Sequence, residues 1–204
     1  MGSHKKFAHA ILSFVLLATT FVVQAAPATI DFESLSDSES LSNQIAGLTF
    51  SNATVLTAGL SLNEFEFPPS SGQNAVFDDG GPLTINFSAP VDSISALITY
   101  SVSLTFKAFD AGLNLVASDS SNFMSNLGLS GNAGSSPNET FSVSFAGGIS
   151  RLVIEGYPSG GSLVLDDLTI DLGPPNPTPE PGTTMLMTIS LMALSAVRRL
   201  KRQT

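Results

Sequence analysis

The chain has 204 residues, of which 17 are Asp or Glu and 8 are Lys or Arg, and it contains no cysteine. Disulfides and thiolate metal sites are therefore excluded. Both histidines lie within the first ten residues, which excludes imidazole-based catalysis and His-ligated zinc from the rest of the chain. Sixteen acidic residues from Asp31 to Asp171 are opposed only by Lys107 and Arg151. Nucleic acid is excluded as a partner because its phosphates need a basic surface, and a divalent cation is favoured.

Residues 1–25 have the pattern of a secretory signal peptide. Lys5 and Lys6 precede an apolar segment, residues 10–23, and small residues follow up to a predicted cleavage after Ala25. We therefore expect export through the Sec pathway. The alternative is an uncleaved N-terminal anchor.

Residues 26–172 predict one all-β domain, a jelly-roll-like β-sandwich of about ten strands. Short runs alternate apolar with polar or small residues, and Gly, Ser, Asn, Asp and Pro separate the runs. The expected strands are 29–33, 48–51, 54–58, 83–88, 91–100, 103–109, 114–118, 139–145, 150–155 and 163–171. Asp78 and Asp79, which precede two glycines, are interpreted as part of a turn.

Two short motifs at the ends of this domain carry the candidate metal ligands. Residues 29–34 read TIDFES, and residues 163–171 read LVLDDLTID. They resemble the opening D/N-F-E and closing Y-I-D-D-V strands of carbohydrate-binding modules with a calcium-stabilised jelly roll. The resemblance implies that the first and last strands are neighbours and that carboxylates from both hold a structural Ca²⁺. The implied ligands are Glu33 and Asp166, with Asp31, Asp167 and backbone carbonyls completing the shell.

Alternation along the last strand gives a physical argument beside this resemblance. Val164, Asp166, Leu168 and Ile170 should share one face, and three of the four are apolar, so Asp166 is expected to point inward. A buried carboxylate must be paired, bound to a metal or protonated. Because the domain has so few basic residues, Ca²⁺ is a suitable partner, since it accepts six to eight oxygen ligands. The alternative is that Asp166 binds backbone amides.

The residues after the domain have three parts. Residues 173–182 form a predicted Pro-rich stalk that ends in Pro179-Glu180-Pro181, and residues 183–204 combine a predicted transmembrane helix with a basic tail, Arg198, Arg199, Lys201 and Arg202. The basic residues should hold their end in the cytoplasm. This order closely resembles the PEP-CTERM sorting signal of Gram-negative bacteria, which an exosortase recognises and cuts near the Pro-Glu-Pro. An ordinary C-terminal membrane anchor is the alternative.

The resemblance implies a protein of the cell envelope or extracellular matrix that is transiently anchored in the inner membrane and is associated with exopolysaccharide and biofilm. From its residues we expect this protein not to be an enzyme. Paired carboxylates can hydrolyse glycosides, but sixteen acidic residues make such pairs inevitable, so their presence does not indicate catalysis. One alternative function is a glycan-binding module. Without tryptophan, it would depend on Tyr100, Tyr157 or exposed phenylalanines for sugar stacking. The other alternative is a membrane-anchored adhesion protein.

Overall fold

The structure, a computed structural model, describes residues 26–172, and all of its strands lie within the range predicted for the sandwich. The predicted signal peptide, stalk and transmembrane helix fall outside the described residues. Within residues 26–172 the chain forms strands, turns and loops without a helix, so no membrane-crossing helix is found in that range. The strands are β1 (Ala28–Ile30), β2 (Leu48–Ser51), β3 (Ala53–Thr57), β4 (Asn74–Asp79), β5 (Leu83–Tyr100), β6 (Thr105–Phe109), β7 (Leu115–Ser120), β8 (Glu139–Glu155) and β9 (Gly160–Asp171).

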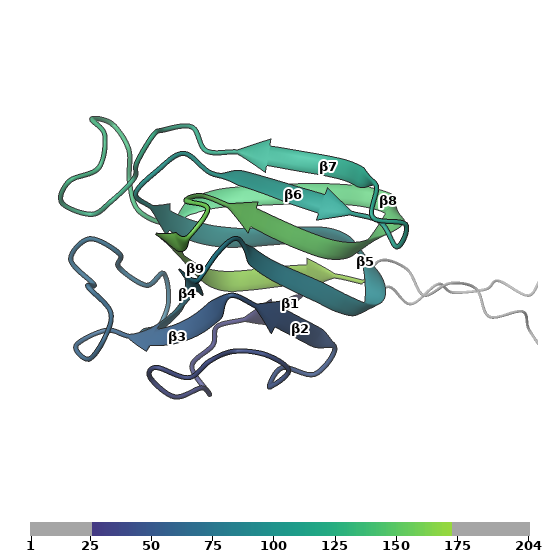
Figure 1. The fold of residues 1–204 in the computed structure, drawn as a ribbon, viewed down its shortest axis with the longest axis horizontal. Coiled ribbons are helices and arrows are strands. Elements are labelled where there is room, and N and C mark those ends of the chain that lie inside the picture. Colours follow the sequence, from purple (N-terminus) through teal and green to yellow (C-terminus); the bar gives the residue numbers. More distant parts are fainter. Residues whose placement is uncertain (1–25, 173–204) are drawn as a thin grey trace, which may run out of the picture.

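Two long strands, β5 and β8, bend and so contribute to both layers of the sandwich (Figure 1). Their pairing shifts register in the middle, between Asn86 and Ser93 of β5, and this irregularity separates two halves of each strand. The first half of β5 and the second half of β8 lie with β2, β6 and β7 in one layer. The second half of β5 and the first half of β8 lie with β9, β4, β3 and β1 in the other layer. All pairings between the named strands are antiparallel.

Most predicted strands are confirmed within a few residues, and three differences are informative. Two pairs of predicted strands, 83–88 with 91–100 and 139–145 with 150–155, are continuous in β5 and β8. Strand β4 was not predicted, because its sequence, NAVFDD, is buried on both sides and does not alternate in polarity. Asp78 therefore lies in a strand, and the interpretation of this residue as part of a turn was wrong.

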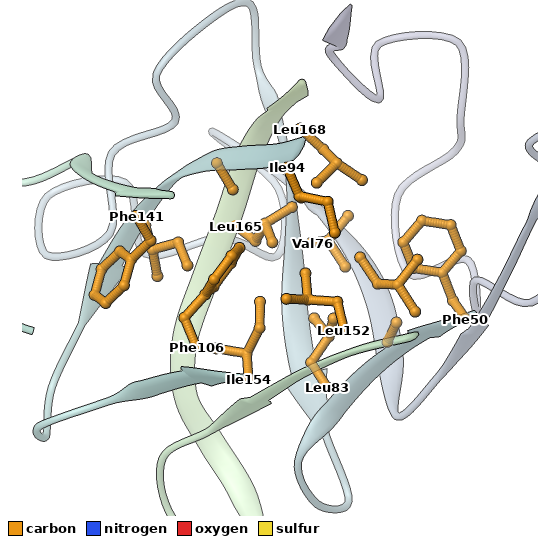
Figure 2. Packing of buried hydrophobic residues seen from close by; sticks show 14 of the residues in the cluster. Phe50, Val76, Leu83, Ile94, Phe106, Phe141, Leu152, Ile154, Leu165 and Leu168 are labelled. Atoms are coloured by element: carbon orange, nitrogen blue, oxygen red, sulfur yellow. The ribbon is translucent and has the colours of Figure 1, made fainter. Parts of the chain in front are cut away.

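The main core fills the space between the two layers (Figure 2). Aromatic rings pack edge-on within it: the ring centroids of Tyr100 and Phe141 lie 6.0 Å apart at an interplanar angle of 79°. A smaller apolar cluster of Leu62, Ala75 and Val164 lies on the other side of the β4–β9 pair, beneath the long loop that follows β3. The layer containing β9 is thus covered on both faces where this loop crosses it.

Two long loops, residues 58–73 and 121–138, lie at one end of the sandwich (Figure 1, left). They contact each other directly: the N–H of Gly128 donates to the carbonyl of Glu66 at 2.8 Å. The described segment begins and ends near the opposite end, because β1 pairs with the last residues of β9, Ala28 opposite Ile170. The loops and the start of the C-terminal segment are therefore on opposite sides of the domain.

Candidate functional site

The predicted metal ligands come together, as expected, where the first and last strands meet. Strand β1 pairs antiparallel with the end of β9, which confirms that these two strands are neighbours. Glu33 follows β1, and Asp166 lies in β9. Both carboxylates reach the same segment of chain, residues 70–74, where the loop after β3 enters β4.

Asp166 is buried, as predicted, but it does not face the main core. Asp166 pairs opposite Leu97 and Thr169 pairs opposite Ser95, so β9 carries one extra residue at this point, and Asp167 adopts a positive φ of 47°. This bulge reverses the alternation. Leu165 faces the main core before it and Leu168 after it, whereas Asp166 points toward the loop above the β4–β9 pair. The predicted shared face of Val164, Asp166, Leu168 and Ile170 was therefore wrong.

Backbone amides surround the Asp166 carboxylate. Its Oδ2 accepts hydrogen bonds from the N–H groups of Ser70 at 2.8 Å and Ser71 at 2.9 Å, and its Oδ1 accepts from the N–H of Asp167 at 2.7 Å. Burial raises the pKa of Asp166 to about 6, although the hydrogen bonds to Ser71 and Asp167 act in the opposite direction. Asp166 thus fixes the loop to β9 through bonds to the main chain.

Glu33 binds the next two amides of the same segment. Its Oε1 accepts from the N–H of Gln73 at 3.0 Å and of Asn74 at 2.7 Å. Gly72, with a φ of 49°, lies between the two carboxylates, and a Cβ there would approach the Glu33 carboxyl carbon to 2.2 Å. Only glycine therefore fits both the conformation and the contact.

The other two predicted ligands have smaller roles in this arrangement. The Asp167 carboxylate accepts a hydrogen bond from the Ser71 hydroxyl at 2.8 Å. Asp31 Oδ1 accepts from the N–H of Glu33 at 3.2 Å, within its own turn. Together, Glu33, Asp166 and Asp167 form what we call the amide clasp of the 70–74 segment.

This clasp does not have the donor set of a calcium site. Ca²⁺ needs six to eight oxygen atoms around one point, whereas Oδ2 of Asp166 and Oε1 of Glu33 each already accept two N–H groups. Within residues 26–172, no group of three or more acidic, His or Cys side chains is arranged to hold a metal. The geometry matches the alternative in which Asp166 binds backbone amides, and a melting experiment in Ca²⁺ and in EDTA separates this alternative from calcium binding.

The same use of carboxylates recurs at two positions that the sequence did not assign to a site. Asp78, fully buried at the end of β4, accepts from the N–H groups of Ser162 at 2.8 Å and Leu163 at 2.9 Å and from the Ser162 hydroxyl at 2.7 Å. Burial raises the pKa of Asp78, and the bonds from Leu163 and Ser162 oppose this shift. No local sequence signal identifies Asp78, because its partners lie more than eighty positions away.

Glu66 provides the second example and joins the two long loops. Its Oε2 accepts from the N–H groups of Leu129 and Ser130, each at 3.1 Å. These bonds lower the pKa of Glu66, with the bond to Ser130 contributing most. Carboxylates of Glu33, Asp166, Asp78 and Glu66 thus each bind main-chain amides that are distant in the sequence, and this accounts for part of the excess of acidic residues.

The two candidate sugar-stacking tyrosines differ in accessibility. Tyr100 is completely buried, and its hydroxyl donates to Glu139 and accepts from the N–H of Phe123. The suggestion that it stacks on sugars is therefore wrong. Burial raises the pKa of Tyr100 to about 12, and the bond to Glu139 adds to this effect. Tyr157 is half exposed in the turn between β8 and β9, so it remains available for stacking.

Comparison with known protein families identifies the C-terminal segment. Residues 177–201 match the family described as the PEP-CTERM protein-sorting motif. The C-terminus carries a PEP-CTERM sorting motif. Such a motif implies an exported protein of a Gram-negative-type envelope that is anchored in the membrane until an exosortase processes it. The matched range includes Pro179, Glu180 and Pro181 and the first three basic residues, Arg198, Arg199 and Lys201.

Comparison with solved structures finds similar β-domains at low sequence identity. The K2 cleaved adhesin domain of Lys-gingipain is 16% identical, with a TM-score of 0.48, over 72% of this chain and 99% of that one. The K1 domain of the same protein from Porphyromonas gingivalis W83 is 10% identical, with a TM-score of 0.45, over 72% and 98%. A family 29 carbohydrate-binding module is 12% identical, with a TM-score of 0.41, over 77% and 99%. No curated protein sequence matches the chain.

Proposed function

We propose that this protein is a non-catalytic β-sandwich that is exported, processed by an exosortase, and retained at the cell surface or in the extracellular matrix by association with exopolysaccharide. The observation that carries the proposal is the sorting motif at residues 177–201, which follows directly after a folded domain whose last strand ends at Asp171. The sorting segment determines where the domain goes. The domain is then the part that remains outside the membrane.

The orientation of the domain supports display at a surface. Strand β9 ends beside β1, at the end of the sandwich from which the sorting segment continues. The loops 58–73 and 121–138 lie at the other end (Figure 1). While the chain is anchored, these loops therefore point away from the anchored end and are free to contact material outside the cell.

The chemistry of the described domain supports a binding role over a catalytic one. Neither histidine nor cysteine is present after residue 25, so an imidazole general base and a thiolate nucleophile are missing. The buried carboxylates of Asp78 and Asp166 accept hydrogen bonds from main-chain amides. Asp166 holds the 70–74 segment, Asp78 holds the start of β9, and each of their four oxygens accepts at least one hydrogen bond.

Cell fractionation tests this function. In the native host, the mature protein should be recovered with the exopolysaccharide matrix. In a strain that lacks the exosortase it should remain in the inner membrane, and in a strain that lacks the exopolysaccharide it should be released into the medium. An unchanged distribution without exopolysaccharide would refute the matrix association. Recovery of full-length protein in the membrane of wild-type cells would favour the membrane-anchored adhesion protein.

A further inference from the structure

Both basic residues of the described domain lie on one surface, the outer face of the layer formed by β2, the first half of β5, the second half of β8, β6 and β7. Leu152 and Ile154 of β8 are fully buried in the main core. Because side chains alternate along a strand, Arg151 and Val153 point to the opposite side. Phe106 and Ala108 of β6 are buried likewise, which places Lys107 on the same outer face. We call this surface the basic face.

The register places three complementary side chains in one row across the basic face. Asn86 of β5 is the partner of Arg151 of β8, and Arg151 is the partner of Phe109 of β6. Neighbouring strands are about 4.8 Å apart, so the row spans about 10 Å, which is enough for one or two sugar residues. Asn86 is exposed, whereas Arg151 and Phe109 are half-buried.

The two cations of this face are not equivalent. Lys107 forms a salt bridge with Glu155 at 2.7 Å, and this is the one ion pair within residues 26–172. Arg151 has no such carboxylate, and its Nε is buried without a hydrogen-bond partner. A buried N–H without an acceptor costs about 1 to 3 kcal/mol. Nε itself is closed to solvent, so a ligand would contact Arg151 through the part of its side chain that is exposed.

Phe109, the partner of Arg151 in β6, is a second side chain that is not packed into the protein interior. It is the large apolar residue of β6 that does not pack against either apolar cluster, whereas Phe106 of the same strand is fully buried in the main core. A half-buried aromatic ring on an outer sheet face can stack on the apolar face of a sugar ring. The exposed amide of Asn86 can exchange hydrogen bonds with sugar hydroxyls.

We propose that the basic face binds a polysaccharide containing uronic acid, with Arg151 pairing to the sugar carboxylate, Phe109 stacking on the ring, and Asn86 bonding to hydroxyls. This inference rests on the proposed function and names its glycan class. Charge complementarity supports it, because a planar guanidinium matches a carboxylate in two parallel hydrogen bonds. The many acidic residues elsewhere do not oppose this contact strongly, since about 10 Å of salt solution screens exposed charges at 0.1 M ionic strength.

Calorimetric titration of the mature protein with oligogalacturonate, with its methyl ester and with polyglutamate tests the proposal. The free-acid sugar should bind, and the ester should bind about tenfold more weakly because it lacks the charge that Arg151 recognises. Polyglutamate offers carboxylates without sugar rings and should not bind measurably. Equal affinity for the ester, or tighter binding of polyglutamate, would overturn the uronic-acid assignment.

Substitutions at Arg151 and at a distant control position test whether the sugar binds to the basic face. Arg151→Gln should weaken binding of the free acid about tenfold and abolish the preference over the ester, because it removes the same pair that the ester removes. Ser144→Lys, on an exposed position of the other layer, restores the net charge of Arg151→Gln and should not restore binding. Recovery of binding in that double variant would show a general charge effect and contradict the site.

Two further results keep this proposal separable from the proposed function. If Arg151→Gln does not fold, the conservative Arg151→Lys should fold and bind with intermediate affinity, and unchanged affinity there would contradict the bidentate contact. If the mature protein fractionates with exopolysaccharide but does not bind oligogalacturonate, the proposed function stands and the uronic-acid proposal is refuted. If the protein fractionates in the same way without exopolysaccharide, the proposed function itself is refuted.

Discussion

At the scale of single residues, buried carboxylates of this domain act as acceptors for main-chain amides. Asp166 binds three N–H groups, and Asp78 binds two N–H groups and a hydroxyl. Each bond to a charged acceptor contributes about 1.5 to 3 kcal/mol, and each buried amide left without an acceptor costs a similar amount. Asp166 is therefore needed for the 70–74 segment, and Asp78 is needed for the start of β9.

The raised pKa values predict that the domain is more stable in mild acid. The folded state holds its proton at Asp166 up to a pKa of about 6, whereas the unfolded chain releases it near 3.8. The stability that Asp166 contributes is fully present below about pH 3.8 and is lost as the pH rises through about 6. The pKa of Asp78 is shifted in the same direction. The contribution of Asp166 to the free energy of unfolding should thus fall by about 2 kcal/mol between about pH 4 and about pH 7.

Urea denaturation across this pH range, at high and constant ionic strength, measures the effect. Asp166→Asn cannot titrate and should reduce the slope of stability against pH. Asp92→Asn, which removes one partly exposed carboxylate of β5, is the matched control for the change in net charge. Stability that rises steadily from pH 4 to pH 7 would contradict the raised pKa values.

The amide clasp also predicts a response to metal that differs from that of a calcium site. Removing the carboxylate in Asp166→Ala leaves the N–H groups of Ser70 and Ser71 without acceptors and should cost about 2 to 4 kcal/mol. The unmodified protein should melt at the same temperature in millimolar Ca²⁺ and in EDTA at equal ionic strength. A rise with Ca²⁺ that Mg²⁺ does not reproduce, and that Asp166→Ala abolishes, would establish the calcium site implied by the resemblance.

At the scale of elements, the close contact of the two long loops depends on one glycine. A Cβ at Gly128 would lie 2.3 Å from the carbonyl oxygen of Phe65. Gly128 does not have a positive φ, so glycine is needed here because of this close contact and not because of the backbone conformation. Gly128→Ala should separate the loops and cost about 1 to 3 kcal/mol. Faster hydrogen exchange at the amides of Leu129 and Ser130, which Glu66 holds, would confirm this.

Leu129→Ala provides the matched control for the loop contact. Its side chain is exposed, so shortening it should leave exchange of the neighbouring Ser130 amide unchanged. If Gly128→Ala also leaves that exchange unchanged, the loops are joined by other contacts than the one between Glu66 and Gly128.

Alternation of apolar and polar residues located most strands, because a strand with one buried face shows its period locally. The same argument failed for β4, which is buried on both sides. It also failed at the bulge beside Asp167, where one extra residue reversed the face of Asp166. The proximity of the terminal motifs was predicted correctly, yet the partners of Asp166 were not, since Ser70 and Ser71 lie about a hundred positions away in the chain.

At the scale of the whole molecule, the sorting motif was predictable because all of its parts lie next to one another in the sequence. The family match at residues 177–201 covers the Pro-Glu-Pro, the apolar segment and most of the basic tail. By contrast, the basic face brings together residues from three strands, and Asn86, Phe109 and Arg151 have no shared sequence signal. Sites of that kind become visible only when strand register is known.

The central claim, that this domain is exported and released from its anchor by an exosortase, predicts a defined mature polypeptide. The intact mass of the protein purified from its native host should correspond to a chain that begins after about Ala25 and ends near Pro181. In a strain without the exosortase, the mass should instead include the apolar segment and the basic residues up to Thr204. A mature protein from wild-type cells that still carries Arg198 to Arg202 would contradict the account.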